Sequence, residues 1–367
     1  MVYSIYVTGT RFSGKTALCL GLMQKFRELG FRVGYFKPIG VGLKEVEGEP
    51  IDPDVYLMRE ILGLREPQEV ITPITLGRRY LDEVENCGEL EHRVMEAYEE
   101  VSGDKDILLI EAPPDPELLI CCGLDVPSLA ERFKARIIFS VRGVEDEVAE
   151  RIILYKEFFR FRGVELLGAI LNFVPLQQLE RMRGVVSPIL RRCGVEVLGV
   201  VPDKRELTMN TVEELRDILE AEVLAGKDRM DRLVDGYLVG AMTPESALTW
   251  LRRSVGCAFI TGGDRTDLIL TALETMPSVI ILTGNIYPSI SVLTAAEEKG
   301  IPILLVPYDT YTTVMKLEHL DGRITPSPTS KRKIQLIHEM IDEYVDWRSI
   351  LEGYADWKRR AKWPPEG

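Results

Sequence analysis

The chain has 367 residues, more than one ordinary hydrophobic core accommodates, so we expect two domains. Its composition is that of a soluble globular protein, and 45 basic against 58 acidic side chains give a formal net charge of −13. Nucleic acids and anionic membranes both need a positive footprint, so neither is expected as the main partner. No apolar run approaches the ~20 residues that span a bilayer, and the N-terminus lacks the pattern of a signal peptide.

Cysteine and histidine usage indicates the compartment. The six cysteines, which show no paired spacing, are Cys19, Cys87, Cys121, Cys122, Cys193 and Cys257. Cys19 and Cys257 lie in apolar runs, where burial in the core is expected. The three histidines are far apart, so the sequence assembles no zinc site. We expect a cytoplasmic protein in a reducing environment.

The N-terminal part alternates short apolar runs with amphipathic stretches. The expected strands are 3–8, 32–36, 107–110, 135–141, 167–171 and 197–201, and the expected helices are 16–29, 54–62, 90–101, 144–161 and 177–193. Such alternation predicts an α/β fold, a doubly wound and mainly parallel sheet with helices on both faces. A break at Pro202-Asp203-Lys204 suggests that this domain covers residues 1–204.

A second, smaller α/β domain is expected over residues 205–324. Its expected helices are 211–219, 244–252, 268–274 and 291–298, and its expected strands are 257–260, 279–282 and 303–306. Residues 325–330 read as a Pro- and Ser-rich linker. The tail, 331–363, has an apolar stripe at helical spacing, which indicates docking onto its own domain or a sister subunit. We therefore assign 325–367 as linker and helical tail.

A phosphate-binding loop is the strongest motif. The residues that fit it, including the first residues of the following helix, are Gly9, Thr10, Arg11, Phe12, Ser13, Gly14, Lys15, Thr16 and Ala17. The motif follows an apolar strand and opens a helix, as it must for backbone N–H groups to face the phosphates. Lys15 would contact the β- and γ-phosphates, and the Thr16 hydroxyl would occupy one magnesium position. ATP or GTP with Mg²⁺ is therefore the expected cofactor.

Magnesium also needs carboxylates. Glu111 ends an apolar strand, where it would be a metal ligand or orient water; the alternative is a surface residue at a strand end. Asp52 and Asp54 precede a helix, where they would act as capping and first-turn acids only, or Asp54 would join the metal site.

The first domain resembles dethiobiotin synthetase. The shared residues are the strand and phosphate loop, Tyr35-Phe36-Lys37-Pro38, Asp54, Glu111 and Ala169-Ile170-Leu171-Asn172. The resemblance implies that Lys37 contacts substrate, that Asp54 and Glu111 hold magnesium, and that Asn172 touches the adenine. Lys15, Lys37 and Glu111 would then be the catalytic residues.

Departures from that family argue against dethiobiotin synthesis itself. After Glu111 the family has a glycine-rich turn, whereas this chain has Ala112-Pro113-Pro114-Asp115, and proline offers no N–H to a ligand. The phosphate loop is one residue shorter than in the synthetase. Thr10 stands where partition-type relatives carry a lysine that contacts the partner subunit, which disfavours that class.

Polar segments follow three strands of the second domain, at the edge where open α/β sheets bind ligands. The candidate ligand residues are Gly262, Gly263, Asp264, Arg265, Thr266, Thr283, Gly284, Asp309 and Thr310. Glycines permit close backbone approach, and Arg265 would pair with an anion; alternatively, Asp264 and Arg265 pair with each other and brace the turn.

These segments, with Gly240-Ala241-Met242-Thr243, closely resemble the DRTGG domain. A dethiobiotin-synthetase-like domain followed by DRTGG resembles the N-terminal region of long phosphotransacetylases. There an acetyl-transferring domain follows, but here only a helical tail does, so we expect no phosphotransacetylase activity from this chain by itself. The resemblance implies metabolite sensing and oligomer assembly.

Three functional interpretations remain open. The first is a nucleotide- and magnesium-binding regulatory protein with weak NTPase activity at most, a small anionic metabolite in its DRTGG domain and a metabolic enzyme as partner. The second is an ATP-dependent ligase or synthetase that acts on a small carboxylate or amine. The third is an assembly module with a vestigial nucleotide site. A homodimer is expected in each case.

Overall fold

The computed structural model describes residues 2–41, 44–46, 49–77, 79–83, 86–143, 145–318 and 330–361. They form two compact units. The first comprises residues up to Asp203 together with those from Ile334 onward, and the second runs from Lys204 to Lys333. Residues 325–329 of the expected linker lie outside the described residues.

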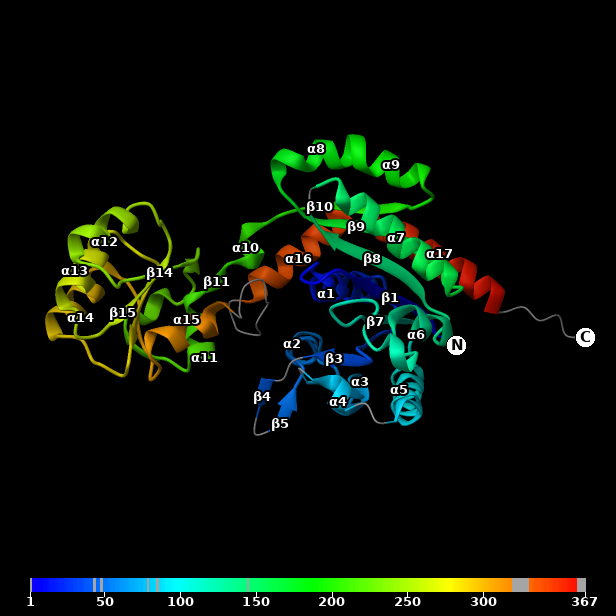
Figure 1. The fold of residues 1–367 in the computed structure, drawn as a ribbon, viewed down its shortest axis with the longest axis horizontal. Helices are drawn as coiled ribbons and strands as arrows, with labels where there is room; N and C mark the ends of the chain where they lie inside the picture. Colours follow the sequence, from blue (N-terminus) through cyan, green and yellow to red (C-terminus); the bar gives the residue numbers. More distant parts are fainter. Residues whose placement is uncertain are drawn as a thin grey trace, which may run out of the picture. The chain divides into compact units, whose positions relative to one another are not determined.

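A six-stranded parallel sheet forms the centre of the first unit (Figure 1). In spatial order its strands are β10 (Val197–Pro202), β9 (Leu166–Val174), β8 (Arg136–Arg142), β1 (Tyr3–Gly9), β7 (Ile107–Glu111) and β2 (Val33–Phe36). Strands buried on both faces need near-continuous apolar runs, and β1, β7 and β10 are buried along their whole length. The parallel α/β fold predicted from the sequence is confirmed.

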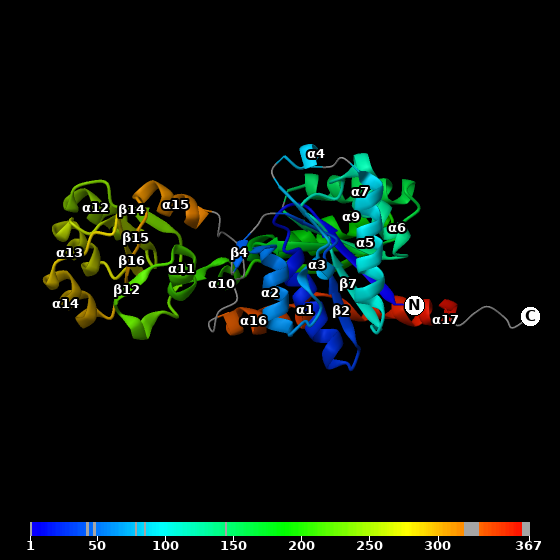
Figure 2. The same cartoon turned by 90° about the horizontal axis from the view of Figure 1, so that it is seen from below.

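Helices cover both faces of this sheet (Figure 2). One face carries α5 (Cys87–Ser102), α6 (Val126–Arg132), α7 (Glu147–Phe161) and the segment made of η2 (Leu176–Gln178), α8 (Leu179–Arg181), the π-helical η3 (Met182–Val186) and α9 (Ser187–Arg192). The other face carries α1 (Lys15–Glu28) and the C-terminal helices. Residue 144, the expected start of α7, lies outside the described residues.

Most of the short elements between β2 and α5 were not predicted. They are β3 (Ile39–Val41), β4 (Lys44–Val46), β5 (Glu49–Ile51), α2 (Pro53–Leu62), α3 (Gln68–Ile71), β6 (Ile74–Leu76) and α4 (Tyr80–Glu83), of which only α2 was expected. β3 pairs with β6 in parallel, across more than 30 residues of chain. Three-residue strands carry too little alternation to show a period, so their pairing depends on tertiary contacts.

The C-terminal tail forms α16 (Ser330–Tyr344) and α17 (Trp347–Ala361) rather than one helix. The break is held by the N–H of Asp346, which donates to the Leu198 carbonyl at 2.6 Å. α16 crosses α1 at Gly21, where an added Cβ would lie 2.4 Å from Ile341 Cγ1. The apolar stripe of the tail therefore packs against its own chain.

A disulfide joins Cys87 and Cys122, a pair that no sequence spacing indicates. Cys87 begins α5, and Cys122 ends the 3₁₀ turn η1 (Ile120–Cys122), so the fold joins sulfurs 35 residues apart. The pairing of these two residues was not predicted from the sequence. Cys19 and Cys257 are buried thiols, as expected.

The second unit contains a five-stranded sheet. In spatial order its strands are β12 (Glu222–Ala225), β17 (Ile303–Leu305), β16 (Val279–Thr283), β15 (Ala258–Gly262) and β14 (Tyr237–Val239). Only β12 is antiparallel. One face packs on α12 (Pro244–Leu251), α13 (Thr266–Glu274) and α14 (Ile290–Lys299), and the other on α11 (Val212–Leu219) and α15 (Thr310–Glu318). Smaller elements are α10 (Arg205–Thr208), η4 (Lys227–Arg229) and the β11 (Asn210–Thr211)–β13 (Leu233–Val234) ladder.

Local signals explain where α11 begins. Thr211 is its N-cap and accepts from the Glu214 N–H, while Glu214 accepts from the Thr211 N–H, which forms a capping box. The buried Glu214 carboxylate also pairs with Lys333, 2.8 Å away. Among the described residues, no helix combines the length and apolar character needed to cross a bilayer.

Candidate functional site

The phosphate-binding loop lies between β1 and α1, at the carboxyl edge of the first sheet (Figure 1). Two glycines let it pass close to neighbouring backbone and side chains. A Cβ on Gly9 would lie 1.8 Å from the Ser140 carbonyl oxygen, and one on Gly14 would lie 2.5 Å from Asn172 Nδ2. Gly14 also has a φ of 80°, which glycine adopts without strain. Both positions therefore require glycine.

Strands β8 and β9 hold the loop from one side. Ser140 Oγ donates to the Ser13 carbonyl at 2.8 Å, and Asn172 Nδ2 donates to the same oxygen at 2.9 Å. The Asn172 side-chain oxygen accepts from the N–H of Phe173. Asn172, expected to touch the base, therefore shapes the loop in this structure. Ser140 was not singled out from the sequence, where its only distinguishing mark is that it is the one hydroxyl residue within the apolar run 137–141.

Lys15 and Thr16 point from the first turn of α1 toward β7. Lys15 Nζ donates to the carbonyls of Thr10, at 3.0 Å, and Pro114, at 3.3 Å. Burial lowers the pKa of Lys15 and outweighs the opposing charge of Glu111. Thr16 Oγ1 donates to Glu111 Oε1 at 2.8 Å. The lysine thus uses two of its three N–H donors on neutral carbonyls, and an anion would replace these with stronger partners.

The loop retains polar groups suited to an anion. Ser13 Oγ is buried and has no hydrogen-bond partner in the structure, and no side chain caps the N-terminus of α1. Unpaired N–H groups at a helix start attract anions, and a buried hydroxyl without a partner carries a desolvation cost that a ligand oxygen would relieve. These features fit a phosphate group.

Lys37 lies among three carboxylates. Its Nζ is 2.9 Å from Asp52, 2.5 Å from Asp54 and 3.8 Å from Glu111. Desolvation opposes the charge on Lys37, but the three acids outweigh it and raise its pKa. The side chain is only 5% exposed. An ammonium group enclosed in this way stabilises the carboxylates and is not open to a substrate.

Asp52 has a structural role. Its carboxylate accepts from the N–H groups of Asp54, Val55 and Val41 as well as from Lys37. It is the N-cap of α2, followed by proline at the first helical position. Asp54 differs because its side chain is 37% exposed. Of the two acids, Asp54 is the one that a ligand can reach.

Glu111 is buried beside β1 at the carboxyl end of β7, not at the surface. Tyr35 Oη donates to Oε2 at 2.9 Å while Thr16 occupies Oε1. Desolvation and the nearby charge of Asp54 raise the pKa of Glu111 to about 7, although Lys37 opposes this. Tyr35 was not singled out from the sequence as a partner of Glu111.

The oxygen donors fit a magnesium ion that shares its ligands with phosphate. Thr16 Oγ1 and the carboxylates of Asp54 and Glu111 are hard oxygen ligands, the kind that Mg²⁺ prefers. Among the described residues, no group of three or more His, Cys, Asp or Glu side chains is arranged to hold a metal by itself. Phosphates and water would therefore complete the coordination.

The remaining loop residues lie at the rim. Arg11 pairs with Asp115 at 2.8 Å, and Phe12 is 71% exposed with a φ of 54°. Arg142 lies over the ring of Phe173, 4.8 Å from its centroid. Arg11 and Arg142 are thus both engaged by neighbouring side chains.

In the second unit, the predicted residues follow the carboxyl ends of β15, β16 and β17. The hydroxyls of Thr283 and Thr310 are 3.0 Å apart, and the Gly284 N–H donates to the Tyr308 carbonyl. A Cβ on Gly263 would lie 1.7 Å from the Ile286 carbonyl oxygen, so only glycine fits. The structure brings these segments together at one edge of the sheet.

The charged residues of this edge have separate partners. Arg265 donates to the Met242 carbonyl at 2.8 Å, and no ion pair joins it to Asp264 among the described residues. Thr266 Oγ1 contacts Ser289 Oγ at 3.4 Å. Asp309 caps α15 by accepting from the Thr312 N–H at 2.7 Å, and backbone hydrogen bonds lower its pKa. The alternative interpretation, in which Asp264 and Arg265 pair with each other and brace the turn, is therefore not what the structure shows.

Known proteins share both parts of the chain. A family described as AAA domain matches residues 3–211, and a family described as DRTGG domain matches residues 214–320. A phosphate acetyltransferase of Nitratidesulfovibrio vulgaris is 26% identical over 94% of this chain and 51% of its own length. The chain spans about half the length of the curated relatives it matches.

Solved structures resemble parts of the chain. One contains the CBS and DRTGG domains of the regulatory region of Clostridium perfringens pyrophosphatase with its activator diadenosine tetraphosphate; it is 26% identical, covers 32% of this chain and 50% of that one, and gives a TM-score of 0.28. Another is cobyrinic acid a,c-diamide synthase of Mycobacterium smegmatis with ADP and magnesium, 17% identical over 56% of this chain and 88% of that one, with a TM-score of 0.36. The AAA-domain match spans more than half of the chain, which therefore belongs to the AAA-domain family and carries a DRTGG domain after it.

Proposed function

We propose that this chain is a regulatory protein that binds ATP or GTP with magnesium in its first unit. The observation that carries the proposal is the phosphate loop itself, with Ser13 Oγ buried and unpartnered and an uncapped helix start. Lys15 would bind the phosphates once they replace its carbonyl partners. Thr16, Asp54 and Glu111 would hold the magnesium, which would neutralise phosphate charge.

We expect this site to hydrolyse its bound nucleotide weakly at most. Arg11 is held by Asp115 and Arg142 lies on Phe173, so each would have to leave a partner to reach a γ-phosphate. Removing a transition-state arginine typically costs a factor of about 10³ or more in phosphoryl transfer. A nucleotide that is bound but slowly hydrolysed suits a sensor, because the bound state persists.

Calorimetric titration of the full chain with ATP and with GTP, each with magnesium, tests the proposal. We expect micromolar binding to one or both nucleotides, lost in Lys15→Ala and retained in Arg160→Ala, which removes an exposed cation remote from the loop. Phosphate release measured on the same samples should be slow. No binding of either nucleotide to the wild type would refute the proposal and leave the assembly module as the interpretation.

The ligase alternative receives no support from Lys37. A ligase of the dethiobiotin-synthetase type would need this ammonium open to its substrate, whereas Asp52 and Asp54 enclose it. Turnover that rises when a small carboxylate or amine is added, and that falls in Lys37→Ala, would nevertheless favour the ligase over the regulator.

For the second unit we propose a small anionic metabolite at the carboxyl edge of its sheet. Close backbone approach at Gly263 and the half-buried guanidinium of Arg265 support this placement. A metabolic enzyme is the proposed target of the regulation, and a homodimer the proposed assembly. Light scattering after size exclusion tests the dimer, and a monomeric mass at micromolar concentration would contradict it.

A further inference from the structure

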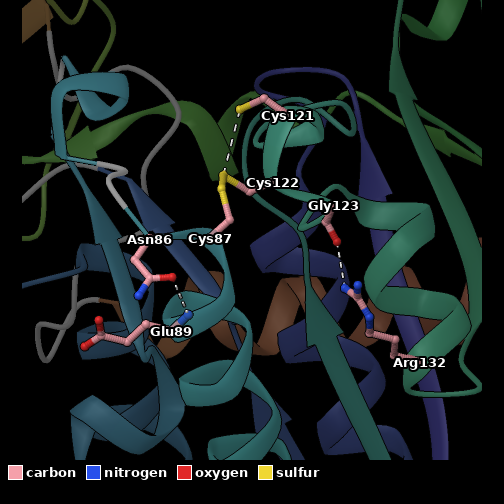
Figure 3. Close-up of a disulfide and its surroundings, with 7 residues drawn as sticks. All are labelled: Asn86, Cys87, Glu89, Cys121, Cys122, Gly123 and Arg132. Carbon is pink, nitrogen blue, oxygen red and sulfur yellow. Dashed lines mark hydrogen bonds between the residues drawn. A yellow bond between two sulfur atoms is a disulfide. The ribbon is translucent and has the colours of Figure 1, made fainter.

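Three sulfur atoms lie together where the segment that follows β7 meets the start of α5. Cys87 and Cys122 are bonded, and the exposed thiol of Cys121 donates to Cys122 Sγ across 3.9 Å (Figure 3). Cys87 and Cys122 are themselves only half-buried. A disulfide that solvent can reach, with a third thiol in contact, is arranged for thiol–disulfide exchange, which requires a thiolate to approach a disulfide sulfur.

The surroundings favour one sulfur as the leaving group. Cys87 is the first residue of the 16-residue helix α5, whose N-terminus carries partial positive charge. Such a position favours a thiolate. On the other side, Arg132 holds the chain just after Cys122 by donating to the Gly123 carbonyl at 2.7 Å (Figure 3).

The disulfide connects to the phosphate loop through residues 112–123. Pro114 accepts from Lys15 Nζ, and Asp115 pairs with Arg11. The same segment ends in η1, which the disulfide ties to α5. While that tie is closed, the segment is held at both ends, and Pro114 stays within reach of the lysine that phosphate must engage.

We propose that Cys87, Cys121 and Cys122 form a thiol–disulfide exchange centre, and that its reduction releases the 112–123 segment and strengthens nucleotide binding. The exchange centre stands by itself, whereas its effect on nucleotide binding rests on the proposed function. The substrate class is a dithiol donor for reduction and a low-molecular-weight disulfide for reoxidation.

Reduction of the disulfide by a dithiol takes two exchange steps. A donor thiolate attacks Cys122 Sγ, the Cys122–Cys87 bond breaks, and the electron pair leaves on Cys87, which takes a proton. The donor's second thiolate then attacks the donor sulfur that is bonded to Cys122. This forms a disulfide within the donor and frees the Cys122 thiolate. Cys121 provides an internal route: its thiolate attacks Cys122, forms a Cys121–Cys122 bond and also frees Cys87.

Differential alkylation with mass spectrometry tests the exchange centre without any nucleotide. The full chain is equilibrated in glutathione buffers from oxidising to reducing, quenched with iodoacetamide and digested. We expect both Cys87 and Cys122 to be labelled under fully reducing conditions and to lose the label reversibly on reoxidation, while exposed Cys193 is labelled throughout. A Cys121–Cys122-linked peptide should appear at intermediate ratios and be lost in Cys121→Ser. Labelling of Cys87 and Cys122 at every ratio, or at none, would overturn the proposal.

Calorimetric titration with magnesium and ATP tests the consequence. The reduced chain should bind about fivefold more tightly, which corresponds to one competing hydrogen bond removed from Lys15. Cys87→Ser should bind like the reduced chain in both buffers, and Cys193→Ser should keep the redox dependence. Equal affinity in both redox states would refute the coupling. No binding in either state would contradict the nucleotide proposal instead, and the labelling result would still decide the exchange centre.

Discussion

The ammonium nitrogen of Lys37 lies 2.5 Å from Asp54 Oδ2, so a side-chain cation already sits against the carboxylate expected to bind magnesium. Because Asp52 and Glu111 also face this lysine, the site holds its acids together without any metal. A metal at Asp54 would have to share or replace this ion pair. Lys37 therefore organises the site and also competes for one of its ligands.

Loss of the Lys37 charge should destabilise the first unit. Lys37→Met leaves Asp52 buried without its cation, and breaking a buried pair in this way costs about 3 kcal/mol or more of the free energy of unfolding. Scanning calorimetry measures the change. Arg160→Met, which removes an exposed ion pair with Glu157, should cost under about 1 kcal/mol. Equal losses in the two variants would show that the buried charge is not needed.

The raised pKa of Glu111, about 7, gives the stability a pH dependence. An acid whose folded pKa lies above its unfolded value near 4.5 contributes stability below that value, and the contribution is lost as the pH rises through 7. The wild type should therefore lose about 2 kcal/mol relative to Glu111→Gln between pH 5 and pH 8. Thermal unfolding of both proteins across that range measures the difference, and a constant difference would contradict a raised pKa.

Protonation of Glu111 stabilises the fold, but it should weaken the binding of nucleotide with magnesium. Magnesium requires the carboxylate form of Glu111, so the affinity for nucleotide with magnesium should rise about tenfold from pH 6 to pH 8. Titration with nucleotide in EDTA is the control, because without metal the dependence on Glu111 should largely disappear. An affinity that falls over this range would argue against Glu111 as a ligand.

The sequence predicted those features of the fold and site that depend on residues close together in the chain. The strand, loop and helix that present Lys15 and Thr16 lie within about 30 residues, so spacing alone placed them. The parallel sheet followed in the same way from apolar runs alternating with amphipathic stretches. Glu111 was placed because it ends one of these runs, and the structure finds it in contact with Thr16.

The features that were not predicted from the sequence depend on contacts between distant segments of the chain. Ser140 reaches Ser13 across 127 residues, and Tyr35 reaches Glu111 across 76. Neither side chain has a distinctive spacing, since each is one polar group in an apolar strand. The Cys87–Cys122 bond likewise depends on where α5 and η1 meet. Such pairs become visible only when the topology is known.

Gly9 and Gly263 should be intolerant of a single methyl group. Gly9→Ala would place its Cβ 1.8 Å from the Ser140 carbonyl, and Gly263→Ala would place its Cβ 1.7 Å from that of Ile286. Backbone must shift in each case, at about 1–3 kcal/mol or more. Gly184→Ala, with open space around its Cβ, should stay within about 0.5 kcal/mol of the wild type. If calorimetry shows that Gly184→Ala loses as much stability as the other two variants, close packing around Gly9 and Gly263 is not the cause.

Docking of the C-terminal helices onto the first unit should depend on the apolar stripe of α16. Ile341 is 3% exposed and packs at Gly21 of α1, so Ile341→Asp would bury a charge without a partner. We expect α16 and α17 to detach and to be cut by trypsin at least tenfold faster, because local opening governs proteolysis. Glu339→Ala, an exposed change on the same helix, should leave the cleavage rate unchanged. If the tail instead docked onto a sister subunit, dilution of the wild type would accelerate cleavage; packing within one chain predicts a rate independent of concentration.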